Sequence, residues 1–514
     1  MKNIIKIAVL LLALLMIVPC LAACNTGGKS GGETTTNDGG IVDPNEDPYL
    51  EQVGDLKRYN YKAFVRSKDT GNGAFYCEDF WVDPATGGAD ALSFAVIARN
   101  AEIETTYNCT ITQVWSTQED SFVEMRGLFD TNQYYEVTVM VATDAASCAT
   151  AGYLSNIMNE NNSNYINLDN EAFDLNSIEQ MTLGDSLYYL SGDMNISTLD
   201  NTISTIFNTN AYWEIADEMA ITFNDSDFAS PYTLVEEGKW TVENMFKIAN
   251  EYTQDANAAD GDLSYDKGDI IGYYEYRAAP LYYFYGAGMR ITENHDGYPE
   301  FTINTDDASE VYNYLFDYLN AEANSLPNGA AAGRGPNFQS GQVLFTDYIL
   351  WDVRRVLYSA DIDFAYGILP VPTIEENEDH HSVVYFQNCC HLWALPYKRA
   401  NNINAAKMLY VMTVYSGMED STLDAYYVRT MYMEVAKDDG SRASLEIIRY
   451  SLVYDIALLY CPAGIWGSFD SFLNRICTVT DKEFATYTSE SRMQTANEQM
   501  NDTIDAFIKY GRED

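Results

Sequence analysis

The sequence has few basic residues for its length. Lys and Arg together number 30 among 514 residues, against 76 Asp and Glu, and the formal net charge at pH 7 is -46. No run of Lys or Arg is longer than two residues. Because such a chain repels phosphate groups, the charge excludes nucleic acid as a partner.

Signatures of catalysis and of metal binding are missing from the segment expected to fold, 56–514. It contains no GxSxG or HExxH motif, and its four histidines, His295, His380, His381 and His391, lack metal-ligand spacing. Two carboxylates at a suitable distance could hydrolyse a glycoside, but 76 acids always offer such a pair. We therefore expect no catalytic residue, no cofactor and no metal site.

Two acidic stretches could in principle bind an ion. The segment 255–269 does not follow the order of an EF-hand loop and is interpreted as an acidic connection. His380 and His381 lie in EENEDHHS, which we interpret as a solvated acidic loop with at most weak metal affinity.

The cysteines form no CxxC pair or zinc pattern. Beyond the N-terminal Cys20 and Cys24, an odd number remains, so buried free thiols and one or two disulfides are both open. These residues are Cys77, Cys109, Cys148, Cys389, Cys390, Cys461 and Cys477.

The N-terminus predicts export. Lys2 and Lys6 precede an apolar run, 7–18, that is too short for a comfortable membrane span, and no later run is longer. The following LAAC resembles a bacterial lipoprotein signal, which implies cleavage after residue 23 and lipidation of Cys24. The alternative is an ordinary secretory signal. A diacylated cysteine would anchor the chain outside the cytoplasm, and the polar segment 24–55 would be a flexible tether.

The remaining chain alternates strand-like and helix-like segments. This pattern predicts an α/β fold with largely parallel sheets, and the 47% hydrophobic content can fill two lobes. Strands are expected at 61–66, 109–115, 136–142, 364–371 and 391–395. Helices are expected at 119–130, after the N-cap Thr241, after 306–307 and from residue 403.

Several segments resemble, in this order, the extracellular solute-binding proteins of ABC importers, especially the family 1 sugar-binding group. They are WTVENMFKIANEY, GAGMRITENHDGYPEF, FQSGQVLFTDYILWDVRR, DFAYGILPVP and HLWALPYKRANNINAAKMLYVMT. The resemblance implies a two-lobed, periplasmic-binding-protein-like fold with a ligand cleft between the lobes. It places lobe 1 at 56–197 plus 361–415 and lobe 2 at 198–360 plus 416–514.

The resemblance also implies ligand contacts. Trp351 matches the position of an aromatic platform, with Asp347 before it as a hydroxyl acceptor, and Tyr276 matches a cleft aromatic. Tyr283 is a further candidate from the cluster of tyrosines that follows, some of which must be buried. Asn388 stands where the family has a glycine-rich turn, a departure that suggests a different ligand. Each aromatic residue could equally belong to a core.

Further candidates come from position along the chain. Asp79, Trp81 and Asp144 follow strands, whose carboxyl ends form the ligand edge of open α/β sheets. Asp193 lies near the first expected crossing between lobes, and Trp466 follows Pro and Gly in a loop. Loop, turn or packing roles are the alternatives.

Together these features predict a monomeric, lipid-anchored binding protein. It would capture a mono- or oligosaccharide by lobe closure and deliver it to a membrane permease. The alternatives are a surface glycan-binding adhesin without transport and, less favoured, a secreted glycoside hydrolase.

Overall fold

The computed structural model places most of the chain after residue 46 in one compact unit, 43–514. The described residues are 47–66, 79–85, 90–117, 121–131, 133, 135–213, 230–255, 268–274, 279–319, 325–326, 336–358, 362–384, 390–397, 403–457 and 488–511. Among them, no helix is both long and apolar enough to cross a bilayer.

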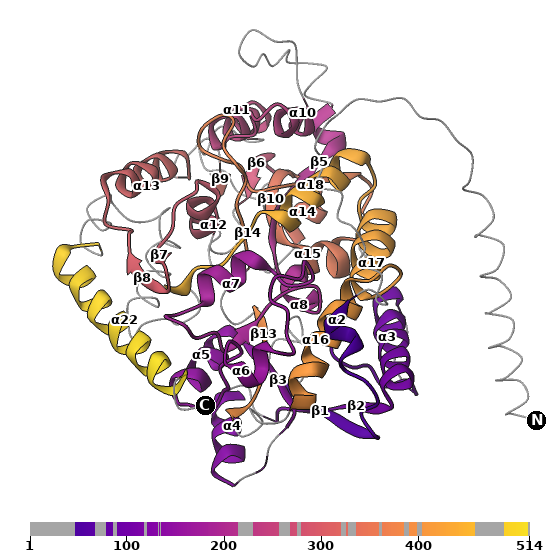
Figure 1. The fold of residues 1–514 in the computed structure, drawn as a ribbon. Helices are drawn as coiled ribbons and strands as arrows, with labels where there is room; N and C mark the ends of the chain where they lie inside the picture. The colour runs from indigo at the N-terminus through magenta and orange to yellow at the C-terminus, as the bar shows by residue number, and fades with distance from the viewer. Residues whose placement is uncertain are drawn as a thin grey trace, which may run out of the picture. The chain divides into compact units, whose positions relative to one another are not determined.

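The first sheet has five strands in the order β2-β1-β3-β13-β4 (Figure 1). The helices α3 (Ala91–Tyr107) and α5 (Ala142–Thr150) pack against it. Its strands are β1 (Tyr59–Val65), β2 (Cys109–Trp115), β3 (Val137–Val141), β4 (Tyr189–Leu190) and β13 (His391–Ala394).

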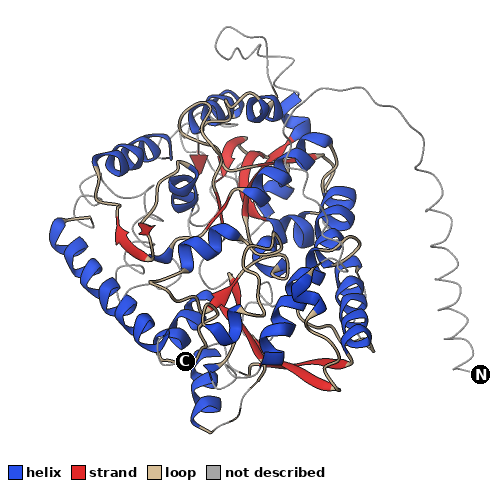
Figure 2. Ribbon diagram, viewed as in Figure 1, coloured by secondary structure: helices blue, strands red, loops and turns tan. Residues whose placement is uncertain are grey.

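The second sheet has the order β11-β5-β10-β6-β9. Helices α10 (Pro231–Glu236), α11 (Val242–Tyr252) and α18 (Asp439–Tyr450) lie against its strands (Figure 2). Its strands are β5 (Ile203–Asn208), β6 (Ile271–Tyr274), β9 (Ser325–Leu326), β10 (Val343–Ile349) and β11 (Tyr366–Leu369).

Shorter elements connect these layers. The helices are α2 (Pro48–Glu51), α4 (Ser121–Asp130), α6 (Glu160–Ser163), α7 (Leu175–Met181), α8 (Ile196–Asp200), α12 (Ala279–Gly286), α13 (Asp306–Leu319), α14 (Pro336–Gln339), α15 (Leu350–Asp352), η4 (Val353–Leu357), α16 (Ile403–Gly417), α17 (Thr422–Asp424), η6 (Ala425–Val435) and α22 (Glu490–Gly511). Two small sheets pair β7 (Thr292–His295) with β8 (Tyr298–Phe301) and β12 (Ser382–Val383) with β14 (Leu452–Val453).

The prediction of an α/β fold is confirmed, but the prediction of largely parallel sheets is wrong. In each of the two five-stranded sheets, two strand pairs are parallel and two are antiparallel. The antiparallel pairs involve β13 and β5, which the chain enters from the other sheet. Each of these strands, entered from the other sheet, is antiparallel to the strands beside it.

One predicted lobe boundary differs from the strand pairing. The segment 361–415 was expected in the first lobe, yet β11 within it pairs with β5 of the second sheet, with Gly367 opposite Phe207. The chain therefore crosses back after Leu369. The segment 416–514 touches both layers, because η6 lies against α3 while α18 lies against β11.

The crossing segments are bonded to each other. The carbonyl oxygen of His391 accepts hydrogen bonds from Asn195 Nδ2 at 2.6 Å and from Thr198 Oγ1 at 3.0 Å, and its N–H donates to Thr198 Oγ1 at 2.9 Å. The outgoing and returning crossings thus form one bonded unit.

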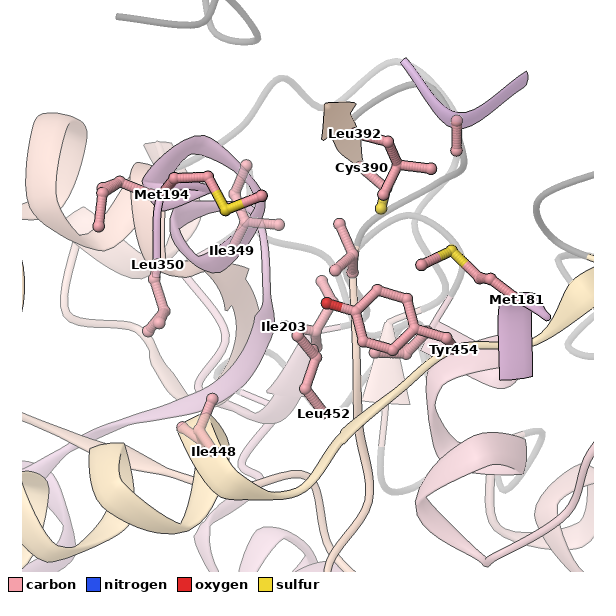
Figure 3. Packing of buried hydrophobic residues seen from close by; sticks show 14 of the residues in the cluster. Met181, Met194, Ile203, Ile349, Leu350, Cys390, Leu392, Ile448, Leu452 and Tyr454 are labelled. Carbon is pink, nitrogen blue, oxygen red and sulfur yellow. The ribbon is translucent and has the colours of Figure 1, made fainter. Parts of the chain in front are cut away.

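Apolar side chains pack around this junction. Figure 3 shows Met181, Ile203, Cys390 and Tyr454 pointing toward one another from separate elements. All four belong to the buried core cluster, which runs through both sheets. Cys109, Cys148 and Cys390 are buried free thiols, and the other candidate cysteines lie outside the described residues.

The hairpin β7–β8 and helix α22 also join the two sides. Asn294 Nδ2 donates to Glu179 O and Thr182 O at 2.9 Å each, at the end of α7, and Gly184 N donates to Gly297 O at 2.8 Å. The φ of Gly297 is +85°, and a Cβ there would lie 2.5 Å from Gly184 N. Glycine is therefore required at this approach.

Candidate functional site

Asp79 and Trp81 lie beside the first sheet. Asp79 is buried, and its Oδ2 accepts hydrogen bonds from Ser197 N at 2.9 Å and Ser197 Oγ at 2.7 Å. This carboxylate fixes the start of α8, where the chain leaves the first sheet. Trp81 is half-buried against the core. Asp79 is thus hydrogen-bonded to the segment that crosses between the sheets. Ligand contact by Asp79 or Trp81 stays a prediction.

A polar network extends from this point to the helices that follow. Arg99 donates to the carbonyl oxygen of Asp79 at 2.7 Å and to Ser416 Oγ at 2.9 Å. Asp200, at the end of α8, accepts from Arg354 Nε and from Tyr426 OH at 3.1 Å each. These bonds hold the crossing against α3, α16, η4 and η6.

Asp144 and Trp351 stand where strands end. Asp144 is in the first turn of α5, directly after β3, and Trp351 is in α15, directly after β10. Both side chains are partly exposed, and Trp351 packs against the core with one side. An exposed aromatic face can stack on the C–H face of a sugar, and contact between Trp351 and a ligand stays a prediction.

Asp347 and Tyr283 are inside the second half of the fold. The Asp347 carboxylate accepts from Tyr273 OH at 2.6 Å, Thr205 Oγ1 at 2.9 Å and Tyr283 OH at 3.4 Å. Burial raises the pKa of Asp347 to about 6, while these hydrogen bonds act to lower it. In the described conformation both side chains are buried and bonded to one another. They support the sheet, and in this conformation neither side chain is exposed enough to contact a ligand as predicted.

Asp193 lines a cavity of about 190 Å³ at the end of β4. Glu171, Asp174, Ser191, Arg449 and Tyr450 also line it. The Ser191 and Tyr454 hydroxyls are 2.9 Å apart and bonded to each other at its wall. This cavity is several times larger than the volume of roughly 30 Å³ that one water molecule occupies.

The electrostatics of this cavity centre on Asp193 and Arg449. Asp193 Oδ1 lies 3.7 Å from Arg449 Nη2, which is beyond hydrogen-bond distance. Burial raises the pKa of Asp193 to about 7, Arg449 acts to lower it, and Glu171, Asp174 and Asp424 act to raise it. The Arg449 guanidinium stacks over the rings of Tyr427, at 4.9 Å, and Tyr450, at 5.0 Å.

A second cavity of about 590 Å³ adjoins the first. The two share the lining residues Asn176, Tyr450, Leu452 and Tyr454 and therefore lie side by side. We call these two cavities together the α7–α18 groove. Its far side is lined by Arg290, Gln180, Glu378, Asp379, His380 and His381.

The two histidines correct the prediction of a solvated loop. Residues 375–379 are exposed, but His380 and His381 are half-buried and line the groove. His380 Nδ1 lies 3.2 Å from Val371 O, and burial lowers the pKa of both imidazoles. They are therefore neutral at pH 7. Within the described ranges, no group of three or more His, Cys, Asp or Glu could hold a metal ion.

Arg449, Tyr450 and Arg290 were not foreseen as site residues. Arg449 and Tyr450 end the amphipathic helix α18, where a basic residue also suits the negative end of the helix dipole. No motif links them to α7, which lies far away in the sequence. Four other predicted residues, Tyr276, Asn388, Trp466 and the lipidation site Cys24, lie outside the described residues, and so does most of the segment 255–269.

Comparison with known proteins bears on the fold. No protein-family model matches the sequence, and no curated protein matches it. Solved structures do match. The sugar-binding protein MalE from the phytopathogen Xanthomonas citri matches with a TM-score of 0.55 at 8% identity, covering 86% of this chain and 97% of its own. A family 1 extracellular solute-binding protein from Bifidobacterium longum subsp. infantis matches with a TM-score of 0.50 at 10% identity, covering 85% and 99%.

The chain has the fold of family 1 solute-binding proteins. An ABC substrate-binding protein from Listeria monocytogenes, in complex with cycloalternan, matches with a TM-score of 0.50 at 10% identity, covering 87% of this chain and 99% of its own. The solute-binding-protein fold has two lobes. The structural match between this chain and these neighbours covers nearly the whole length of each neighbour. The expected two-lobed, periplasmic-binding-protein-like fold is thereby confirmed.

Proposed function

We propose that this chain is the solute-binding protein of an ABC importer and that it captures an oligosaccharide between its lobes. The observation that carries the proposal is the solute-binding-protein fold itself, whose neighbours of similar structure are described as binding sugars. Partly exposed Trp351 at the end of β10 supports a carbohydrate ligand, because an indole ring stacks on a sugar face. Fold alone does not name the ligand, so the site must be tested.

Closure of the lobes would follow the usual rule for two-state binding proteins. A ligand favours the closed form only through contacts that are better in that form. The crossing at Asn195, Thr198 and His391 is the part of the described chain around which such a rotation would occur. The proposal includes no catalysis, and bound sugar should be recovered unchanged.

The first test is a thermal-shift screen of the mature chain against maltose, maltotetraose and cycloalternan, with amino acids and spermidine as controls. A ligand at 100 times its Kd should raise the free energy of unfolding by roughly 2.7 kcal/mol. Trp351→Ala should weaken sugar binding at least tenfold. Trp213→Ala is the matched control, because Trp213 is 51% exposed and follows β5. Since β5 runs antiparallel to β10, its end lies near the start of β10, at the opposite edge of the sheet from Trp351.

The outcomes separate the alternatives. Sugar that is hydrolysed would point to a glycosidase, and a shift only with amino acids or spermidine would overturn the carbohydrate assignment. If Trp213→Ala weakens binding as much as Trp351→Ala, the proposed location of the site is wrong.

The lipid anchor and the permease are separate parts of the proposal. Lipidation of Cys24, after the LAAC sequence, would tether the protein to the outer face of the membrane and keep it near its permease at high effective concentration. Cys24→Ser should release the protein into the aqueous phase of a detergent partition. An unchanged distribution would overturn the anchor while leaving sugar binding intact.

A further inference from the structure

The hairpin β7–β8 is fixed at its base to the second sheet layer. The buried Asp455 carboxylate accepts hydrogen bonds from Ile291 N at 2.8 Å and from Thr292 Oγ1 at 2.5 Å. It also accepts from Tyr285 OH, in α12, at 2.9 Å. Helix α12 packs on α13, and α13 packs on α11 beside the second sheet. The base of the hairpin should therefore move with that sheet.

Helix α7 is fixed to the first sheet layer. It packs against β4, and the Asp174 N–H at its start donates to Ser191 O, directly after β4, at 3.1 Å. Beyond the end of α7, Leu187 O accepts from Ile157 N at 2.7 Å, within the same layer. Helix α7 should therefore move with the first sheet.

The hairpin binds the end of α7 through one side chain. Asn294 Nδ2 donates to the carbonyl oxygens of Glu179 and Thr182 at 2.9 Å each and lies 3.3 Å from that of Gln180. The last carbonyl groups of a helix have no partner within the helix. Asn294 supplies donors to these groups from the other sheet layer, so separation of the layers would leave them without this partner.

A backbone bond and α22 reinforce this contact. Gly184 N donates to Gly297 O at 2.8 Å, at the approach that requires glycine. Outside it, α22 is bonded to both layers, because Asn497 accepts from Phe301 N at 3.1 Å and a carbonyl oxygen of α22 accepts from Tyr188 OH at 2.7 Å. Figure 1 shows α22 running past β8 toward α5. The hairpin, the end of α7 and α22 thus form one bonded junction.

This junction and the crossing lie at opposite ends of the α7–α18 groove. Leu199, in α8, lines the smaller cavity, whereas Gln180 and Arg290, next to the junction, line the larger one. The seven residues of α7 span about 10 Å along this side of the groove. A rotation about the crossing displaces the most distant groups furthest, so the lobes cannot separate without breaking the bonds of Asn294.

We propose that the β7–β8 hairpin is a clasp between the lobes, which stabilises the closed form through Asn294 and Gly297 and must release α7 before the lobes open. The clasp rests on the proposed closure of two lobes and not on the identity of the ligand. Its bonds join protein to protein and need no ligand. They bias the equilibrium between the open and closed forms, so a weaker clasp increases the population of the open form.

Hydrogen exchange of the mature chain, measured by mass spectrometry without added ligand, tests the clasp at its own backbone bond. In Asn294→Ala, exchange of the segment 182–186, which contains the Gly184 amide, should be about tenfold faster than in the wild-type chain. The segment 391–394, in β13, should keep its protection. Asn244→Ala is the matched control, because Asn244 Nδ2 donates to Lys239 O at 2.8 Å within the second layer. It should leave the exchange of 182–186 unchanged.

Small-angle X-ray scattering of the same proteins measures the separation of the lobes. Asn294→Ala should have a larger radius of gyration than the wild-type chain and than Asn244→Ala. Gly297→Asn should show the same two effects, because asparagine tolerates a positive φ but its Cβ would lie 2.5 Å from Gly184 N. This second variant decides the question if Asn294→Ala loses the protection of 391–394.

Two results would overturn the clasp. Unchanged exchange of 182–186 in both variants would show that the contact does not restrain this segment. Faster exchange with an unchanged radius of gyration would show that Asn294 caps α7 and does not hold the lobes. Neither measurement uses a sugar, so a failed thermal-shift screen would reject the carbohydrate assignment and leave this test intact.

Discussion

Asp347 and Asp193 are both acids whose pKa is raised by burial, to about 6 and about 7 respectively, but they differ in what surrounds them. Asp347 is enclosed by three hydroxyl groups inside the second sheet layer. Asp193 faces a cavity, with one guanidinium at 3.7 Å. The comparison shows that burial and a perturbed pKa do not by themselves mark a ligand site. Unused hydrogen-bonding capacity beside a cavity is the more informative observation.

The largest expected effect is on stability. Asp347→Ala leaves the hydroxyls of Tyr273, Tyr283 and Thr205 without their common acceptor, and we expect a loss of about 3 kcal/mol in the free energy of unfolding. Asp193→Ala should lose less than about 1 kcal/mol, because among the described residues its carboxylate accepts no hydrogen bond and is paired only with Arg449 at 3.7 Å. Urea denaturation at pH 7 measures both. Equal losses would contradict the distinction between the two acids.

The titration of Asp347 should contribute to the pH dependence of the free energy of unfolding. Its pKa in the folded chain, about 6, is above the ordinary value of 3.8, so between these pH values the folded state binds more protons than the unfolded state. Its contribution is therefore complete below about pH 4 and is lost as pH rises to about 6, with a total change of up to about 3 kcal/mol. Unfolding measured from pH 4 to pH 7 should show this decline in the wild-type chain.

Asp347→Asn should remove that part of the decline, because an amide does not titrate. Asp193 predicts a decline of the same sign that extends to about pH 7, since its folded pKa is higher. A slope that is unchanged in Asp347→Asn would show that other groups cause it.

A smaller effect separates binding from stability at Asp193. Asp193→Asn keeps the shape of the side chain and removes a carboxylate whose charged form is disfavoured by burial, so it should not lower the free energy of unfolding at pH 7. Asp193 is a predicted ligand contact, so binding of maltotetraose should weaken about tenfold, because a carboxylate is a stronger acceptor than an amide. Calorimetry at pH 7 on the wild-type chain and on Asp193→Asn measures this difference. Unchanged binding would remove Asp193 from the predicted ligand contacts.

The smallest effect belongs to an exposed acid. Glu243 pairs with Lys247 one turn along α11, with both side chains about half exposed. Glu243→Ala should change the free energy of unfolding by no more than about 0.5 kcal/mol. The change should shrink further in 0.5 M salt, which screens the pair. A loss comparable to that of Asp347→Ala would show that burial does not order these three acids.

Much of the fold could be predicted because its signals are local. Thr241 accepts a hydrogen bond from Asn244 N at 3.2 Å, as the N-cap prediction required, and α11 buries Met245 and Ile248. The strand predicted at 109–115 is β2 without change, and α16 begins at Ile403. Periodicity and capping determine these elements, so the sequence is sufficient for them.

The α7–α18 groove could not be predicted in the same way. Asp193 was proposed from its place near the first crossing, and it does line the groove. Arg449 and Tyr450 come from a helix more than two hundred residues later, and only the packing of α18 on β11 brings them there. Asp347 was misleading for the opposite reason: its neighbours along the chain give no sign that Tyr273 and Thr205 enclose it.

The way the chain crosses between its sheets also determines when it can fold during synthesis. The first sheet needs β13, residues 391–394, between β3 and β4, and α22 at the end of the chain is bonded to both halves, through Tyr188 to Phe507 and through Phe301 to Asn497. A nascent chain of two hundred residues therefore cannot complete its first sheet. The polypeptide must remain without its full native structure until nearly all of it has been made.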